Sequence, residues 1–131
     1  MERRTKTYAL LAAFGCALAY LLAGKALTAV LPQVPEEASR MWAFVHRCAA
    51  APIVEELVFR GVIQQLARPL GERQAVALQA VLFAVQHRGP AGMAYALVCG
   101  LVLGTIRSRT GSVWPGMLLH TLNNLLVFAA G

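Results

Sequence analysis

Two adjacent carboxylates, Glu55 and Glu56, stand in an apolar stretch and are followed by Arg60. Glu56 and Arg60 are four residues apart with the acid first, the favourable order for an ion pair along a helix. Glu55 is rotated by about 100° from Glu56 on a helix and has no cation at this spacing. We predict that Glu56 neutralises Arg60 and that Glu55 acts as a general base. The alternative is a charged interfacial turn near Pro52.

Two histidines and an asparagine could complete a site with these acids. His87 and His120 lie in separate apolar segments, and Asn124 follows His120 by four residues. His120 and Asn124 therefore project from one face of a helix. A lone buried histidine is often only a packed residue, but ionisable groups within a bilayer usually face a cavity or each other. The combination predicts a functional site.

The composition predicts that helices in a membrane position these residues. The chain has 131 residues, of which 58% are hydrophobic and 14% charged, and its mean hydropathy is +0.59. Long apolar stretches cover residues 8–34, interrupted by Lys25, and 74–86, 89–106 and 110–131. A helix needs about 20 residues to cross the hydrocarbon core, so the middle two stretches would need flanking residues or tilt. Counting the glutamate segment, we predict an all-α, polytopic transmembrane helix bundle of about five spans.

Prolines indicate where the segments begin and end. Pro32 and Pro35 should end the first span, so we divide one integral membrane domain into an N-terminal transmembrane anchor, residues 1–35, and a core, residues 36–131. The stretch after Pro35 either forms an additional interfacial helix or continues into the glutamate segment. Pro52 either begins a new helix or kinks the existing one.

The basic residues predict a lipid partner and an orientation. A net charge of +6 would suggest nucleic acid in a soluble protein, but here the basic residues lie at the ends of the apolar stretches, so we predict no nucleic-acid partner. Three clusters fall on one side if each segment crosses once, which predicts a cytoplasmic N-terminus: Arg3, Arg4 and Lys6; Arg68 and Arg73; Arg107 and Arg109. Glu55 then lies nearer the outer side if its helix begins at Pro52, but at mid-membrane if the helix begins near Met41.

Three short motifs, in order, resemble those of the CPBP intramembrane protease family. Residues 55–60 (EELVFR) resemble its EExxxR motif, residues 83–87 (FAVQH) its FxxxH motif, and residues 120–124 (HTLNN) its HxxxN motif. The family, also called Abi, includes CAAX prenyl protease 2, proteins like lysostaphin resistance protein A, and bacteriocin-processing relatives. The similarity covers about residues 47–127. Each motif alone is weak, whereas the ordered set is specific.

The resemblance implies an intramembrane endopeptidase. Glu55 and His87 would activate water, and His120 and Asn124 would bind the oxyanion that develops on the substrate. Phe83 would pack beside the site, and Arg60 would hold Glu56. The substrate would be a protein or peptide with a membrane-associated C-terminal segment, either CAAX-type or a sorting anchor. We expect an integral protein of a bacterial inner (plasma) membrane.

The same residues also fit other functions. Glu55, His87 and His120 could bind Zn²⁺ as a metalloprotease site with an open water position. No HExxH-type pair is present, however, and we favour a glutamate mechanism without a cofactor. A bacteriocin immunity-type protein would use the same scaffold without catalysis, and a small transporter is a more distant alternative. The chain is shorter than many family members, so homo-oligomerisation is one way to close a cavity.

Overall fold

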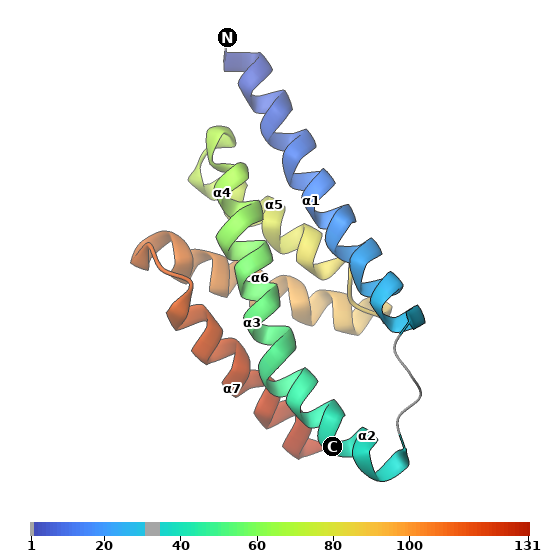
Figure 1. Cartoon of the computed structure of the whole chain (residues 1–131). Helices are drawn as coiled ribbons and strands as arrows, with labels where there is room; N and C mark the ends of the chain where they lie inside the picture. Colours follow the sequence, from blue (N-terminus) through green and yellow to red (C-terminus); the bar gives the residue numbers. More distant parts are fainter. Residues whose placement is uncertain (1, 31–34) are drawn as a thin grey trace.

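The residues that the structure describes form a bundle of helices (Figure 1). The computed structural model describes residues 2–30 and 35–131, and no strand occurs in these two ranges. The prediction of an all-α fold is confirmed. The predicted end of the first span at Pro32 lies outside the described residues.

Helix α1, Glu2–Val30, runs along one side of the bundle (Figure 1). Its buried residues are Ala9, Ala13 and Ala17, which recur every four residues and form one narrow face. Small side chains on such a face let two helices approach closely. Large apolar side chains elsewhere on the helix, including Leu11 and Phe14, are exposed. The helix thus presents small residues to the bundle and large apolar ones outward, as suits a lipid environment.

The glutamate segment belongs to one long helix, residues 36–66, which we call the central helix. It consists of α2 (Glu36–Val45), η1 (His46–Ala50), α3 (Ala51–Glu55), η2 (Glu56–Ile63) and α4 (Gln64–Leu66). Both η segments are π-helical, and the backbone stays helical where they join their neighbours.

Pro52 therefore neither begins this helix nor breaks it. The ring of an internal proline crowds the preceding turn, and here that turn is the wider π-helical η1. The stretch after Pro35 is the first part of the central helix and not a separate interfacial helix. Because the helix begins at Glu36, the argument that placed Glu55 near the outer side no longer holds.

The remaining helices pack behind and beside the central helix. The short 3₁₀ segment η3, Arg68–Leu70, leads into α5, Glu72–Ala84; α6 spans Gly89–Thr110 and α7 spans Trp114–Ala130. Helices α5 and α6 approach closely at Gly100, where an added Cβ would lie 2.9 Å from the Cα of Ala80. Gly111, with φ +70°, ends α6 in the left-handed conformation that favours glycine.

Two of the described helices, α1 and α6, are long and apolar enough to cross a membrane. Helices α5 and α7 have 13 and 17 residues, fewer than the roughly 20 that span the hydrocarbon core. The central helix is long enough but carries several charged residues. The total of five spans therefore stays a prediction.

The central helix contacts all the other long helices, α1, α5, α6 and α7. Its residues Phe59 and Ile63 are fully buried in a core shared with Ala13 of α1 and with Leu82 and Phe83 of α5. This position places the two glutamates beside α5 and α7, the helices that lead to or carry the predicted histidines.

Candidate active site

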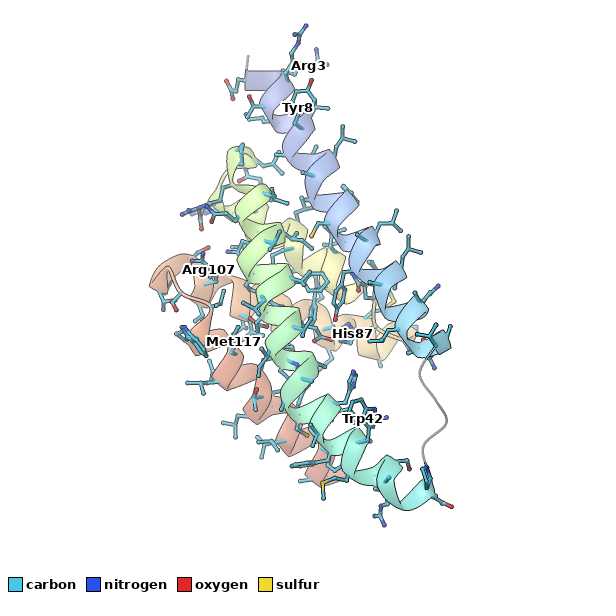
Figure 2. All side chains as sticks on the ribbon, in the orientation of Figure 1. Arg3, Tyr8, Trp42, His87, Arg107 and Met117 are labelled. Carbon is cyan, nitrogen blue, oxygen red and sulfur yellow. The ribbon has the colours of Figure 1, made fainter. Side chains whose placement is uncertain are left out.

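A cavity of about 840 Å³ lies between the central helix, the turn after α5, and α7. All four residues predicted to carry the chemistry line it, namely Glu55, His87, His120 and Asn124. Figure 2 shows His87 in the middle of the bundle, and Trp42 lower in the view, towards the start of the central helix. The other lining residues are Arg40, His46, Arg47, Ala51, Val127, Phe128 and Gly131.

Glu55 faces this cavity from the central helix. Its side chain is 20% exposed, and its Oε2 lies 3.5 Å from Nε2 of His120. His87 also lies near enough to interact electrostatically with it. Glu55 thus has two histidines as neighbours and access to the cavity, the arrangement that a general base needs.

Glu56 is fully buried on another face of the same helix. Its Oε1 lies 3.1 Å from Nη1 of Arg60, the pairing that the sequence predicts. The same oxygen also lies 2.8 Å from Nδ1 of His120, whose N–H can donate to it. Gly116 makes room for this carboxylate, since an added Cβ there would lie 2.7 Å from Oε2. The contact with His120 was not anticipated, because 64 residues separate the partners and only helix packing brings them together.

Phe83 lies at the centre of the buried side of the site. The Cζ atom of Arg60 lies 4.5 Å from the centroid of its ring, a cation–π contact. The ring of His87 is 4.7 Å away and that of His120 is 5.9 Å away, both edge to face. One aromatic side chain therefore fixes the spacing between the two histidines and supports the arginine.

His87 lies in the turn after α5 and is oriented by the end of that helix. Its Nδ1 lies 3.0 Å from the backbone oxygen of Phe83, one turn earlier. If Nδ1–H donates to that oxygen, the neutral ring keeps Nε2 as an acceptor. His87 can therefore accept a hydrogen bond from a water molecule in the cavity.

His120 is placed between the two adjacent glutamates. Nδ1 faces Glu56 and Nε2 faces Glu55, and the side chain is 6% exposed. A ring nitrogen that carries a proton can donate it to the carboxylate that it faces. This arrangement suits a residue that stabilises negative charge.

Asn124 joins α7 to the central helix. Its Nδ2 donates to the backbone oxygen of Arg47 at 2.8 Å. An asparagine amide carries two N–H groups, so one donor remains for other partners. Sequence reasoning missed this bridge, and with it a structural task for Asn124.

Three ionisable residues that were not predicted to belong to the site also line the cavity: Arg40, His46 and Arg47. One sequence feature could have indicated Arg47. It precedes Ala51 and Glu55 at intervals of four residues, which places all three on one face of a helix. This spacing could be used only once a helix was known to continue through Pro52.

The zinc alternative required Glu55, His87 and His120 as ligands. In the part of the chain that the structure describes, no three His, Cys, Asp or Glu side chains are arranged to hold a metal ion. Both ring nitrogens of His120 already face carboxylates. Among the described residues, Glu55, His87 and His120 are therefore not gathered as three ligands of one ion.

Residues 37–126 match the family model described as type II CAAX prenyl endopeptidase Rce1-like. The chain belongs to this family. Membership confirms the resemblance seen in the three motifs and indicates a CAAX-type endopeptidase embedded in the membrane. The comparison with curated proteins gave no match, and neither did the comparison with solved structures.

Proposed function

We propose that the protein hydrolyses a peptide bond close to the C-terminus of a membrane-associated protein or peptide, with prenylated CAAX-type sequences as the first candidates. The observation that carries this proposal is the shared cavity of Glu55, His87, His120 and Asn124. The family membership supports the reaction class, and the geometry supports the roles.

Glu55 and His87 hold the attacking water in the proposed mechanism. Glu55 removes a proton as the water oxygen bonds to the substrate carbonyl carbon, while His87 accepts the second hydrogen bond of the water. The proton then passes from Glu55 to the leaving nitrogen as the C–N bond breaks. The surrounding apolar helices limit the access of bulk water.

His120 stabilises the developing oxyanion. Glu56 holds it at Nδ1, so that Nε2–H is oriented towards the cavity beside Glu55. The second N–H of Asn124 is the other candidate donor. Glu56, Arg60 and Phe83 position His120 and make no contact with substrate in this mechanism.

Cleavage of a farnesylated peptide with a CAAX-type end tests the proposal. Wild-type protein in lipid vesicles should release the C-terminal fragment, whereas Glu55→Gln, His87→Ala and His120→Ala should not. Arg109→Gln is a matched control, because Arg109 lies outside the cavity. Wild-type turnover that persists in all three site variants would exclude this mechanism and favour a non-catalytic, immunity-type role.

We also propose that the reaction uses no cofactor. The lack of an HExxH-type pair in the sequence supports this, and chelation tests it. Activity should survive prolonged treatment with a strong zinc chelator, in protein shown to lack stoichiometric metal. Activity lost on chelation and restored only by a divalent ion would show a metalloprotease.

The basic residues support an orientation with the N-terminus in the cytoplasm. Arg68 and Arg107 line one small cavity, and Arg73 and Arg109 line another. Figure 2 shows Arg3 at the end of the bundle away from Trp42, and Arg107 at the side of the bundle between the levels of these two residues. Clusters of basic residues at the ends of apolar helices suit the cytoplasmic side. A reporter fused to the N-terminus should be protected from external protease in intact cells.

A further inference from the structure

The catalytic cavity carries more positive than negative charge at one end. Arg40 and Arg47 line it, and neither forms an ion pair with any side chain that the structure describes. Glu55 is the one acid among the lining residues, and it is already next to His120. The exposed guanidinium groups of Arg40 and Arg47 can therefore bind an anion that enters the cavity.

Arg47 is the better placed of these two arginines. It precedes Glu55 by eight residues on one helix face, with Ala51 between them, and all three line the cavity. At the helical rise the separation is about 12 Å. The hydrogen bond from Asn124 to the backbone oxygen of Arg47 fixes this turn against α7. The spacing of the backbone at Arg47 and at the proposed base is thus set by a rigid element.

We infer that Arg47, assisted by Arg40, binds the free C-terminal carboxylate of the substrate while the scissile bond lies at Glu55. This inference rests on the proposed function. An extended peptide covers about 3.3–3.6 Å per residue, so three to four residues bridge roughly 12 Å. Arginine suits the task because its planar group donates two parallel hydrogen bonds to a carboxylate. Arg47 would make the enzyme select a chain end over an internal bond.

Two farnesylated peptides that differ only at their last atoms test this inference. One ends in a free carboxylate and the other in a carboxamide. Wild-type protein should cleave the acid about tenfold to hundredfold more efficiently, mainly through a lower KM, because a charge-assisted contact is lost in the amide. Arg47→Gln should reduce kcat/KM for the acid to that for the amide, and Arg47→Lys should restore part of the preference. Arg109→Gln, the matched control, should keep the wild-type ratio.

Binding separates this inference from the proposed function. The Glu55→Gln protein should bind the acid more tightly than the amide, and adding Arg47→Gln should remove the difference. If the Glu55→Gln protein binds the acid more tightly but the wild type cleaves neither peptide, the proposed function is contradicted and the carboxylate site at Arg47 is supported. If the wild type cleaves both peptides equally well, the proposed function is supported and binding of the terminal carboxylate by Arg47 is contradicted. An Arg47→Gln defect that is equal for both peptides and appears only in anionic vesicles would assign Arg47 to lipid phosphate and also overturn the inference.

Discussion

The catalytic cavity and the interface of α4 with α5 and α6 both hold polar side chains inside an apolar bundle, yet they use different partners. At that interface, Gln64 donates to the backbone oxygen of Gly104 at 3.0 Å and to the hydroxyl of Ser108 at 2.9 Å. Gln79 donates to the backbone oxygens of Gly100 at 2.7 Å and of Val76 at 3.0 Å. We call the contacts of Gln64 and Gln79 the glutamine interface.

At the candidate active site, His120, the two glutamates and Arg60 pair with one another through their side chains. His120 lies between Glu55 and Glu56, and Glu56 lies between His120 and Arg60. Carboxylates and imidazoles can gain or lose a proton near neutral pH, whereas the amides and carbonyls of the glutamine interface cannot. The nature of the partner therefore separates polar groups placed for chemistry from polar groups placed for packing. Variants of the first region should change turnover, and variants of the second should change stability.

Glu55→Gln should give the largest effect. It removes the proposed base while keeping the size of the side chain, and turnover should fall by about 10²–10⁴-fold. The melting temperature in detergent should stay close to that of the wild type, since Glu55 makes no close ion pair with Arg60. Turnover is followed with the farnesylated acid peptide, and unfolding by circular dichroism. An unfolded Glu55→Gln protein would show that Glu55 is needed for stability, and the distinction between the two regions would then be wrong.

Glu56→Gln should affect both turnover and stability. Removing one charge of a buried ion pair costs on the order of 3–5 kcal/mol, because Arg60 is left without its partner. The loss of charge beside Nδ1 of His120 should also lower turnover in the protein that remains folded. Thermal unfolding and the rate per folded molecule measure the two parts separately. A stable Glu56→Gln protein with full turnover would show that neither contact matters.

Gly100→Ala probes the packing of α5 against α6. A Cβ 2.9 Å from Ala80 forces the helices apart, at a cost of about 1–3 kcal/mol. Turnover per folded molecule should be unchanged, because Gly100 does not line the catalytic cavity. Gly92→Ala is the matched control, since nothing lies within 4 Å of the added Cβ. A drop in turnover without a loss of stability would show that the packing of α5 against α6 contributes to catalysis, contrary to the distinction drawn above.

Gln64→Met should give the smallest effect. It keeps the volume of the side chain and removes the hydrogen bonds to Gly104 and Ser108, for a loss of about 1 kcal/mol. Chemical unfolding should detect this loss, while the rate per folded molecule stays at the wild-type value. A strong loss of turnover would mean that the glutamine interface contributes to catalysis.

The same contrast explains what the sequence could predict. Hydropathy predicts the all-α fold, and the i, i+4 rule predicts the pairing of Glu56 with Arg60. Family motifs name the residues that turn out to share a cavity. Contacts between helices were out of reach, because nothing in the spacing of residues 56 and 120 shows which face of α7 meets the central helix.

The sequence also left open whether the helix continues through Pro52. Proline usually ends or kinks a helix, and both interpretations of Pro52 follow that rule. In the structure a π-helical turn lies before Pro52 and the helix continues, as the alternative of one long helix requires. Because a new helix beginning at Pro52 was equally open from the sequence, Arg47 could not be named as a neighbour of Glu55 in the cavity.

The central helix also determines where the chain can accept extra residues. Arg47, Glu55 and Arg60 sit on one continuous helix, so a single residue inserted between the first two would turn them apart by about 100°. The same insertion in the turn between α6 and α7, at Gly111 or Ser112, would leave every helix in register. The protein should therefore tolerate changes of length in the turn between α6 and α7 and lose function from the shortest insertion within the central helix.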